Sequence, residues 1–315
     1  MNIGIDMMGG DFAPLEAVKG VQSYFEHNTE TSVHLTLIGD TAAVSPYLSF
    51  LESYKDRYTW VPSTQVIEME EHPTKAFKEK PESSIAIGFG LLARKKIDAF
   101  IGAGNTGAML VGAMYSVKAI EGVLRPTIAS FVPREDGRFN LLLDVGINAD
   151  CKAEHLVQFA QLGTIYLERV LGIASPRVSL LNIGEEEGKG NLLAQAAYPL
   201  LKEAAHINFI GNTEGRDIFL DKADIFVCEG FVGNIVLKLA ESVYHIFKQK
   251  RKLEDTFLDN FNYEIYGGTP ILGINAPVMI GHGISSAKAF HNMISNIEKI
   301  VESDLIKAFQ EEFRQ

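Results

Sequence analysis

AFIGAGNTGAMLVGAMYSV, at residues 99–117, is the longest run in the chain without Asp, Glu, Lys, Arg or His. Its length approaches that of a membrane-spanning helix. The glycines and polar residues at 102–107 would, however, expose backbone polar groups that hydrocarbon cannot satisfy. We therefore interpret the segment as a buried strand (residues 96–101), a glycine-rich turn and a helix over 106–119. This strand–turn–helix unit indicates an α/β protein.

The same alternation extends along the chain in both directions. It predicts a mainly parallel sheet covered by helices on both faces. No lobe boundary can be placed, so we expect residues 1–315 to form a single catalytic unit, with two lobes around a cleft as the alternative. The other expected strands are 2–8, 33–39, 127–133, 140–146, 177–184, 207–212, 224–230 and 276–283; the other expected helices are 14–26, 153–171, 191–205, 231–252 and 285–309, and Ser83-Ser84 is expected to cap a further helix.

Composition narrows the class of protein. The chain has 315 residues, 46% of them hydrophobic, and a net charge of −11. Such a chain can bury a large core, and its acidity argues against general nucleic-acid binding. The two cysteines, Cys151 and Cys228, form no CxxC pair, so we expect reduced thiols and no metal site. Because residues 1–10 also lack a basic signal region, we expect a cytoplasmic protein.

Glycine- and asparagine-rich turns follow most of the expected strands. In a parallel sheet these turns lie at the carboxyl edge, where ligands bind in open α/β folds. Glycine allows close backbone approach, and the N–H groups of the helices that follow stabilise anions. The pattern predicts a nest for an anion. The turns are 8–11, 103–108, 144–148, 182–190, 210–217, 229–234 and 281–283.

Familiar catalytic signatures are missing. The chain contains neither GxxxxGK[ST] nor GxSxG, which argues against a P-loop and against a nucleophile elbow. GAGNTG at 102–107 does read GxGxxG, so dinucleotide binding by a dehydrogenase stays as an alternative. The chemistry is expected to need no nucleophile from the enzyme and no cofactor.

The ordered set of motifs resembles the PlsX family of bacterial phosphate acyltransferases. The resemblance implies an α/β/α sandwich similar to the phosphate acetyltransferase and isocitrate dehydrogenase group, and a homodimer. It implies acyl transfer from acyl-[acyl-carrier-protein] to inorganic phosphate. The acyl-phosphate would then be the substrate of a membrane glycerol-3-phosphate acyltransferase. A peripheral position at the inner face of the membrane is therefore an alternative to a purely cytoplasmic location. The motifs are DMMGGDFAP, KPESSIAIG, AGNTGA, RPTIASFVP, LLLDVGIN, NIGEEEGKG, EGRD, VCEGFVGNIVLK, YGGTPILG and HGISSAKAF.

The chain departs from the family pattern at several places. Gly102 replaces a usual serine, Ile147 a usual alanine and Glu229 a usual aspartate. Residues 248–266 form a shortened amphipathic and basic segment where many relatives carry a longer hairpin used at the membrane.

Three residues are the candidates for catalysis. Lys189 lies between two glycines and is expected to contact phosphate or the thioester oxygen; the alternative is a solvated loop lysine. His282, also between glycines, is expected to protonate the leaving thiolate or to bind phosphate; the alternative is a hydrogen-bonded structural histidine. Asn234 opens the long helix four residues before Lys238, which places both on one face.

Further residues are expected to bind phosphate or substrate. Asn105, Thr106 and the N–H of Gly107 stand at a helix start, where plain N-capping is the alternative. Asp6 and Asp11 flank the first turn and are expected to be structural, since carboxylates repel phosphate. The full binding set is Gly104, Asn105, Thr106, Gly107, Asn148, Gly233, Lys238, Gly267 and Gly268.

One dense basic run remains. Lys248, Lys250, Arg251 and Lys252 are expected to dock acidic carrier protein or anionic lipid; the alternative is a solvated helix end. The competing functions are a short-chain phosphotransacylase that uses acyl-CoA, an NAD-dependent dehydrogenase, and a non-catalytic scaffold for carrier protein.

Overall fold

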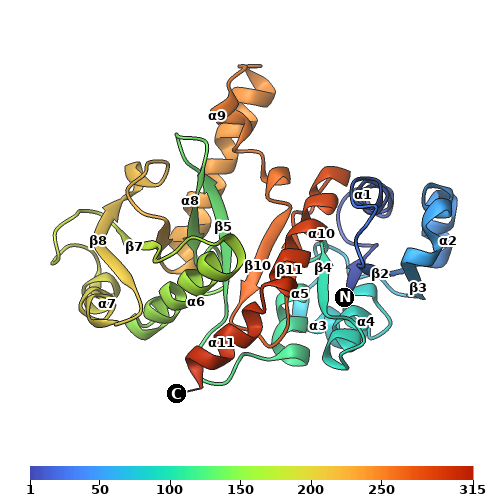
Figure 1. Cartoon of the computed structure of the whole chain (residues 1–315), viewed down its shortest axis with the longest axis horizontal. Helices are drawn as coiled ribbons and strands as arrows, with labels where there is room; N and C mark the ends of the chain where they lie inside the picture. Colours follow the sequence, from blue (N-terminus) through green and yellow to red (C-terminus); the bar gives the residue numbers. More distant parts are fainter. Residues whose placement is uncertain (315) are drawn as a thin grey trace. The chain divides into compact units, whose positions relative to one another are not determined.

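The computed structural model describes residues 1–314, which divide into two compact units (Figure 1). Unit 1 comprises Met1–Ala119, Glu264–Pro270 and Ile274–Glu302. Unit 2 comprises Ile120–Tyr263, Ile271–Gly273 and residues 303–314. The boundary that the sequence left open therefore falls after Ala119, and the chain returns to both units near its C-terminal end.

Unit 1 is built on parallel strands. Their order is β3 (Tyr58–Pro62), β2 (His34–Gly39), β1 (Asn2–Asp6), β4 (Ala99–Gly102) and β11 (Val278–Gly281), with β10 (Gly268–Leu272) antiparallel to β11. Helices α1 (Leu15–His27) and α10 (Ala287–Glu302) pack together, as do α3 (Pro73–Glu79), α4 (Ser84–Ala93) and α5 (Thr106–Gly112). Shorter helical elements are α2 (Thr41–Val44), η1 (Ser45–Arg57) and the π-helical turn η2 (Ala113–Val117).

Unit 2 repeats this plan with different strands. The last residues of β10 pair with β5 (Thr127–Pro133), and the order continues through β6 (Phe139–Leu143), β9 (Ile225–Val227), β7 (Arg177–Asn182) and β8 (Asn208–Glu214). The pairs from β6 to β8 are parallel, whereas β5 is antiparallel to both neighbours. The helices are α6 (Ala153–Leu171), α7 (Leu192–Glu203), α8 (Gly230–Val243), α9 (Thr256–Asp259) and α11 (Leu305–Phe313), with short helical turns η3 (Gly215–Asp217), η4 (Tyr244–Lys250) and η5 (Tyr263–Ile265).

The fold class predicted from the sequence is confirmed, and most expected elements are present. Helix α6 has the predicted bounds, and Ser83 caps α4 by accepting a hydrogen bond from Ala86 N. The helix expected over 285–309 is wrong as one piece, because Asp304 takes a left-handed conformation with φ 53° and separates α10 from α11. Strands β3 and β10 and helix α3 were not predicted.

Helix packing explains one conspicuous glycine in unit 1. A β-carbon on Gly20 of α1 would overlap Phe290 of α10, so glycine allows these helices to meet closely. On α10, Phe290, Met293 and Ile294 are buried, which confirms the apolar stripe read from the sequence. Each such side chain stabilises the fold by roughly 1.5–3 kcal/mol when fully buried.

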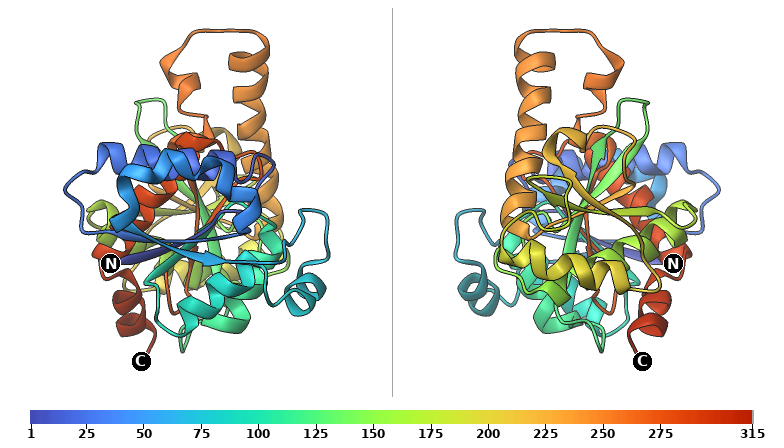
Figure 2. Two further views of the ribbon diagram at one scale, coloured as in Figure 1. Left: turned by 90° about the vertical axis from the view of Figure 1, so that its right-hand side faces the viewer. Right: turned by 90° about the vertical axis from the view of Figure 1, so that its left-hand side faces the viewer.

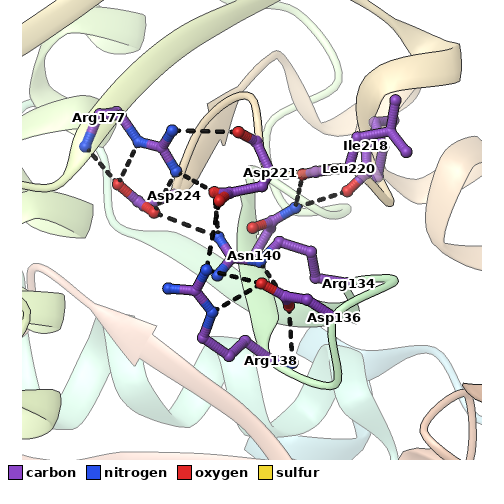
Figure 3. Close-up of polar contacts among 9 residues, drawn as sticks. All are labelled: Arg134, Asp136, Arg138, Asn140, Arg177, Ile218, Leu220, Asp221 and Asp224. Atoms are coloured by element: carbon purple, nitrogen blue, oxygen red, sulfur yellow. Dashed lines mark hydrogen bonds and ion pairs between the residues drawn. The ribbon is translucent and has the colours of Figure 1, made fainter.

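An ion-pair network occupies the amino edge of the unit 2 sheet (Figure 3). Arg134 is its buried centre, with only 2% of its side chain exposed. Its Nη1 lies 2.7 Å from Asp221 and its Nε lies 2.9 Å from Asp136. The network joins the β5–β6 turn to the starts of β7 and β9 through Arg134, Asp136, Arg138, Arg177, Asp221 and Asp224.

A helical hairpin extends from the same edge. It consists of α8, the π-helical η4 and α9, drawn in orange in Figure 2. Phe261 after α9 packs against Phe219 with ring centroids 5.1 Å apart, and Phe219 O accepts a hydrogen bond from Glu135 N in the β5–β6 turn. Helix α8 starts at the carboxyl end of β9, so it runs from the carboxyl edge of the sheet to the amino edge.

Candidate active site

In unit 1, the turns after β1, β4 and β11 meet at the carboxyl edge of the sheet. Asp11 N donates to Gly283 O at 2.7 Å, which joins the first turn to the last. A β-carbon on Gly9 would overlap Gly104 N, so the first turn also lies against the second. The convergence predicted for these three turns is confirmed within this unit.

Asp6 holds the first of these turns. Its side chain is 1% exposed, and Oδ1 accepts a hydrogen bond from Met8 N at 3.0 Å. Burial raises the pKa of Asp6, while contacts with Ser84 and with the N–H groups of Met8 and Gly9 act in the opposite direction. This arrangement agrees with the structural role expected for Asp6.

Both the oxygen and the nitrogen of the Asn105 side-chain amide form hydrogen bonds within unit 1. Its Oδ1 accepts from Ala108 N at 3.0 Å, which caps α5. Its Nδ2 donates to the carbonyl oxygens of Glu68, Met69 and Glu71 at 3.0, 3.2 and 3.0 Å. The capping alternative is thereby confirmed. A direct contact of this side chain with phosphate stays a prediction, and it would require these hydrogen bonds to open.

Replacing Asn105 with alanine is expected to lower the free energy of unfolding by about 2 kcal/mol. The change removes a helix cap and leaves carbonyl groups of the 68–71 segment without their donor. Urea titration followed by circular dichroism measures the loss. Thr106→Ala, at the exposed next position, is the control and should change stability by less than about 0.5 kcal/mol. Equal effects of the two changes would contradict the role assigned to Asn105.

Close packing accounts for three of the predicted glycines in unit 1. A β-carbon on Gly107 would overlap the Pro73 ring. Gly267 has φ +77°, and a β-carbon there would lie 2.5 Å from Met293 N. A β-carbon on Gly268 would lie 2.7 Å from a strand carbonyl of β11. These glycines are therefore required by the fold, whether or not they also approach a ligand.

Thr106 and His282 are the accessible candidates among the rest of unit 1. Thr106, the first residue of α5, is exposed, whereas Gly104 is buried beside Asp6 at the turn. His282 is partly exposed directly after β11, and its carbonyl accepts a hydrogen bond from Ser285 N at 2.9 Å. The structure thus places His282 on the same edge as the 104–107 turn.

In unit 2, the turns after the parallel strands also converge. Gly230 N donates to Asn148 O at 2.7 Å, and a β-carbon on Gly233 would overlap Asp144 O. Asn212 Nδ2 donates to Glu186 O at 2.9 Å, which links strand β8 to the turn after β7. The amide-rich turns of this unit therefore share its carboxyl edge, as the sequence predicted.

Asp144 organises the turn after β6, and the sequence did not single it out. Its Oδ1 accepts from Gly146 N and Ile147 N at 3.1 and 3.2 Å. Its Oδ2 accepts from Asn148 N and Asn148 Nδ2 at 2.8 and 2.7 Å. Burial raises the pKa of Asp144, and these donors act in the opposite direction. The carboxylate fixes the backbone that supports Gly230 and Gly233.

Asn148 and Asn234 lie at this turn in different ways. Asn148 is 7% exposed, and its Nδ2 donates to Pro126 O at 2.9 Å as well as to Asp144, so its side chain holds the turn together. Asn234 is exposed, and its Oδ1 lies 3.4 Å from the β-carbon position of Gly146. Of the two, Asn234 is the one whose side chain is exposed to solvent above the turn.

The two candidate lysines are both half-exposed. Lys189 Nζ is 3.9 Å from Glu186 Oε1, and the Lys189 carbonyl accepts from Asn182 Nδ2 at 3.1 Å. Lys238 Nζ is 2.7 Å from Glu241 Oε2 on the same helix. The backbone of Lys189 is thus fixed while its ammonium group remains accessible to a ligand.

The basic cluster divides into two kinds of residue. Lys248 is 17% exposed and lies 2.7 Å from both Glu254 and Asp259, and these carboxylates raise its pKa. It ties η4 to the segment around α9, whereas Lys250, Arg251 and Lys252 are exposed. These ion pairs engage the Lys248 ammonium group within the protein, which argues against the docking role expected for Lys248.

Unit 2 also contains a pocket that the sequence did not predict. Its volume is about 240 Å³, and it lies between the carboxyl ends of β7 and β9 and the first turns of α7 and α8. Glu229, the family departure noted above, forms part of its wall and caps α8 by accepting from Val232 N at 3.0 Å. Burial, followed by the charges of Asp144 and Asp150, raises the pKa of Glu229 against the effect of this hydrogen bond.

Comparison with known proteins identifies the family. Residues 1–308 match the family model described as fatty acid synthesis protein. The chain belongs to this family. The phosphate acyltransferase of Dictyoglomus thermophilum is 42% identical, over 97% of this chain and 95% of that protein. The phosphate acyltransferase of Desulforamulus reducens is 40% identical, over 99% of this chain and 97% of that protein. The resemblance read from the motifs is confirmed.

Solved structures support the fold. A phosphotransacetylase from Streptococcus pyogenes matches with a TM-score of 0.65 at 17% identity, over 98% of this chain and 94% of that chain. A 4-hydroxythreonine-4-phosphate dehydrogenase from Klebsiella pneumoniae matches with a TM-score of 0.56 at 11% identity, over 96% and 99%. At these identities the likeness concerns the fold alone.

Two features that residues 1–314 lack bear on membranes and metals. None of the helices there combines the length and the apolar content needed to cross a bilayer. In the same residues, His, Cys, Asp and Glu side chains do not gather in a group of three or more that suits a metal ion.

Proposed function

We propose that this protein is a phosphate acyltransferase that moves a fatty acyl group from acyl-[acyl-carrier-protein] to inorganic phosphate. The observation that carries the proposal is the full-length likeness to relatives named phosphate acyltransferase, at 42% and 40% identity. The amide-rich turns at the carboxyl edge of each unit support it, because backbone N–H groups suit phosphate and a developing oxyanion.

The reaction needs little covalent chemistry from the protein. An oxygen of phosphate attacks the thioester carbonyl carbon, a C–O bond forms, and the C–S bond breaks. The thiolate then takes a proton and leaves as the carrier thiol. We assign contact with phosphate or the thioester to Lys189 and Asn234. Thr106 and the N–H of Gly107 are assigned further contact with phosphate. His282 is assigned the proton transfer. Positioning of the two reactants supplies much of the rate enhancement.

Lys189→Ala is expected to lower kcat/KM for acyl-phosphate formation at least about tenfold, because a cation is removed from the 182–190 turn. The free energy of unfolding should stay within about 0.5 kcal/mol, since Lys189 is half-exposed. Lys202→Ala is the matched control, because Lys202 is also exposed and pairs with Glu187 of the same turn at 3.2 Å. Full activity of Lys189→Ala would remove this residue from the mechanism.

Carrier docking, membrane contact and dimerisation belong to the same proposal. Lys250, Arg251 and Lys252 are exposed at the end of the α8–η4 helix, and Leu253 beside them is 49% exposed. Cations next to an apolar side chain suit an acidic carrier protein or an anionic membrane surface. We further propose a cytoplasmic homodimer that acts near a membrane glycerol-3-phosphate acyltransferase.

The test is to incubate the purified protein with palmitoyl-[acyl-carrier-protein] and phosphate, and to trap acyl-phosphate with hydroxylamine. The proposal expects phosphate-dependent hydroxamate. A strong preference for acetyl-CoA as donor would instead indicate a short-chain phosphotransacylase. Nicotinamide absorbance changes with hydroxy acids would indicate a dehydrogenase, and carrier binding without product would indicate a scaffold.

A further inference from the structure

The pocket of unit 2 has a mainly apolar wall. Eight of its twelve lining residues are apolar, and they come from α6, β7, α7 and α8 and from the residues that directly follow β7 and β9. Leu156, Leu180 and Leu193 are among them, and Ile183 beside them is 80% exposed. An apolar surface that reaches from the sheet end to solvent indicates a ligand that buries hydrocarbon.

The polar residues of the wall already have partners. Asn191 Oδ1 accepts from Ala194 N at 2.9 Å, and Glu229 Oε2 accepts from Val232 N at 3.0 Å. Asn182 donates from Nδ2 to a carbonyl at 3.1 Å and accepts through Oδ1 at 2.8 Å. A ligand therefore meets few groups that require a polar contact.

The charge of the wall disfavours anions. Glu229 is the one charged residue among those that line the pocket, and it is an acid. A carboxyl group in this position repels phosphate when it is ionised. The side chains of this wall therefore provide no cation to hold a phosphate group.

The size of the pocket sets the length of the occupant. An apolar cavity of about 150 Å³ accommodates benzene, which has six carbons. By proportion, the pocket of about 240 Å³ holds roughly ten carbons of a chain. A long acyl chain would place one segment here and leave the rest outside.

We propose that this pocket binds a segment of the acyl chain, roughly ten carbons long, between α7 and α8. The inference rests on the proposed acyl transfer and adds to it a subsite. Gly190 in the wall directly follows Lys189, the residue proposed to contact phosphate or the thioester oxygen. Asn182 and Ile183 of the same turn also line the pocket, so the hydrocarbon would lie against the turn assigned to the chemistry.

The first test measures binding without catalysis. The fluorescent apolar probe N-phenyl-1-naphthylamine is bound to the full chain and displaced by n-alcohols of six to fourteen carbons. Affinity should rise by about fourfold per methylene up to about ten carbons and then flatten. Ala194→Trp, in the wall, should weaken the affinity for decanol at least tenfold. Ala196→Trp, exposed on the same helix and outside the wall, should change it less than twofold.

A second pair of variants keeps the test decisive if Ala194→Trp does not fold. Val232→Trp lies in the wall on α8, and Ile235→Trp lies outside it on the same helix, where Ile235 is 53% exposed. Thermal unfolding by circular dichroism identifies the variants that fold. The proposal is overturned if the wall variants that fold bind decanol as tightly as the control variants do. It is also overturned if the affinity for n-alcohols does not depend on their chain length.

Activity separates this inference from the proposed function. With palmitoyl and butyryl donors, Ala194→Trp should reduce the ratio of kcat/KM values, long to short, at least tenfold relative to Ala196→Trp. An unchanged ratio overturns the subsite. Absence of acyl-phosphate in the unmodified protein, together with the expected decanol binding, would refute the acyltransferase and leave a hydrocarbon-binding pocket.

Discussion

Asp144→Asn is expected to lower the free energy of unfolding by about 3–5 kcal/mol. Both carboxylate oxygens of Asp144 accept two N–H donors each, and the side chain is fully buried. Asparagine has the same shape, but one of its ends is a donor. Wherever that end lies, it faces N–H groups of the 146–148 turn and leaves them unpaired. Urea unfolding, monitored by fluorescence and circular dichroism, measures the loss.

Asp150→Asn is the matched control, because Asp150 is exposed six residues further along. It should change stability by less than about 0.5 kcal/mol. A loss below about 1 kcal/mol in Asp144→Asn would show that the turn does not depend on the carboxylate. Because burial raises the pKa of Asp144 above its unfolded value, ionisation of Asp144 costs the folded state more than the unfolded state. This single ionisation should therefore reduce stability as pH rises from the unfolded pKa of about 3.9 through the folded pKa, although the hydrogen bonds of the turn remain. The variant should lose this contribution to the pH dependence.

Arg134→Met is expected to lower the free energy of unfolding by about 2–4 kcal/mol. The methionine keeps most of the buried stem but removes the cation that lies 2.9 Å from Asp136 and 2.7 Å from Asp221. Asp221 and Asp224 are then left with Arg177 as their shared neighbour at 2.5 and 3.0 Å. Thermal and urea unfolding measure the change.

Arg138→Met provides the comparison within the same network. Arg138 pairs with Asp136 and Asp221 as Arg134 does, but 65% of its side chain is exposed. Exposed pairs contribute about 0–1 kcal/mol, so this variant should lose far less stability. If both variants lose the same amount, burial of Arg134 is not the cause.

The change of stability at acidic pH provides an independent test of this ion-pair network. Burial acts to raise the pKa of Asp224, but contacts with Arg177 and the charge of Arg134 outweigh it, so this pKa is lowered. The resulting stabilisation is present above the unfolded pKa of about 3.9 and is lost as pH falls through the lower folded pKa. Arg134→Met should therefore lose less stability on acidification than the unmodified protein does.

Local pattern predicted most of the fold because each element carries its own signal. The apolar spacing of α6 and the runs of β1, β2, β5 and β7 give their positions to within a few residues. The elements that were missed have weak local signals. Strand β3 is largely unburied, and β10 contains Gly268 and Pro270, which are unusual inside a strand. The break at Asp304 carries neither glycine nor proline.

The candidate site was harder to predict, because a side chain's partners come from distant parts of the sequence. Asn105 was identified, but its bonds to residues 68–71 were not visible in the local pattern. Asp144 could have been found from its place before a Gly-Ile-Asn turn, since Asx side chains bond to backbone N–H groups just beyond them. The pocket could not, because its wall combines residues of α6, β7, α7 and α8 with the turns after β7 and β9.

The course of α8 has a consequence for substrate delivery. From Gly230 to Lys250, at about 1.5 Å per residue, the helix covers roughly 30 Å between the pocket and the exposed cations at its far end. A donor anchored at Lys250 would need a flexible tether of that reach to present its thioester beside Lys189. A shorter tether would confine anchoring to the near half of the helix and leave the far tip to another partner.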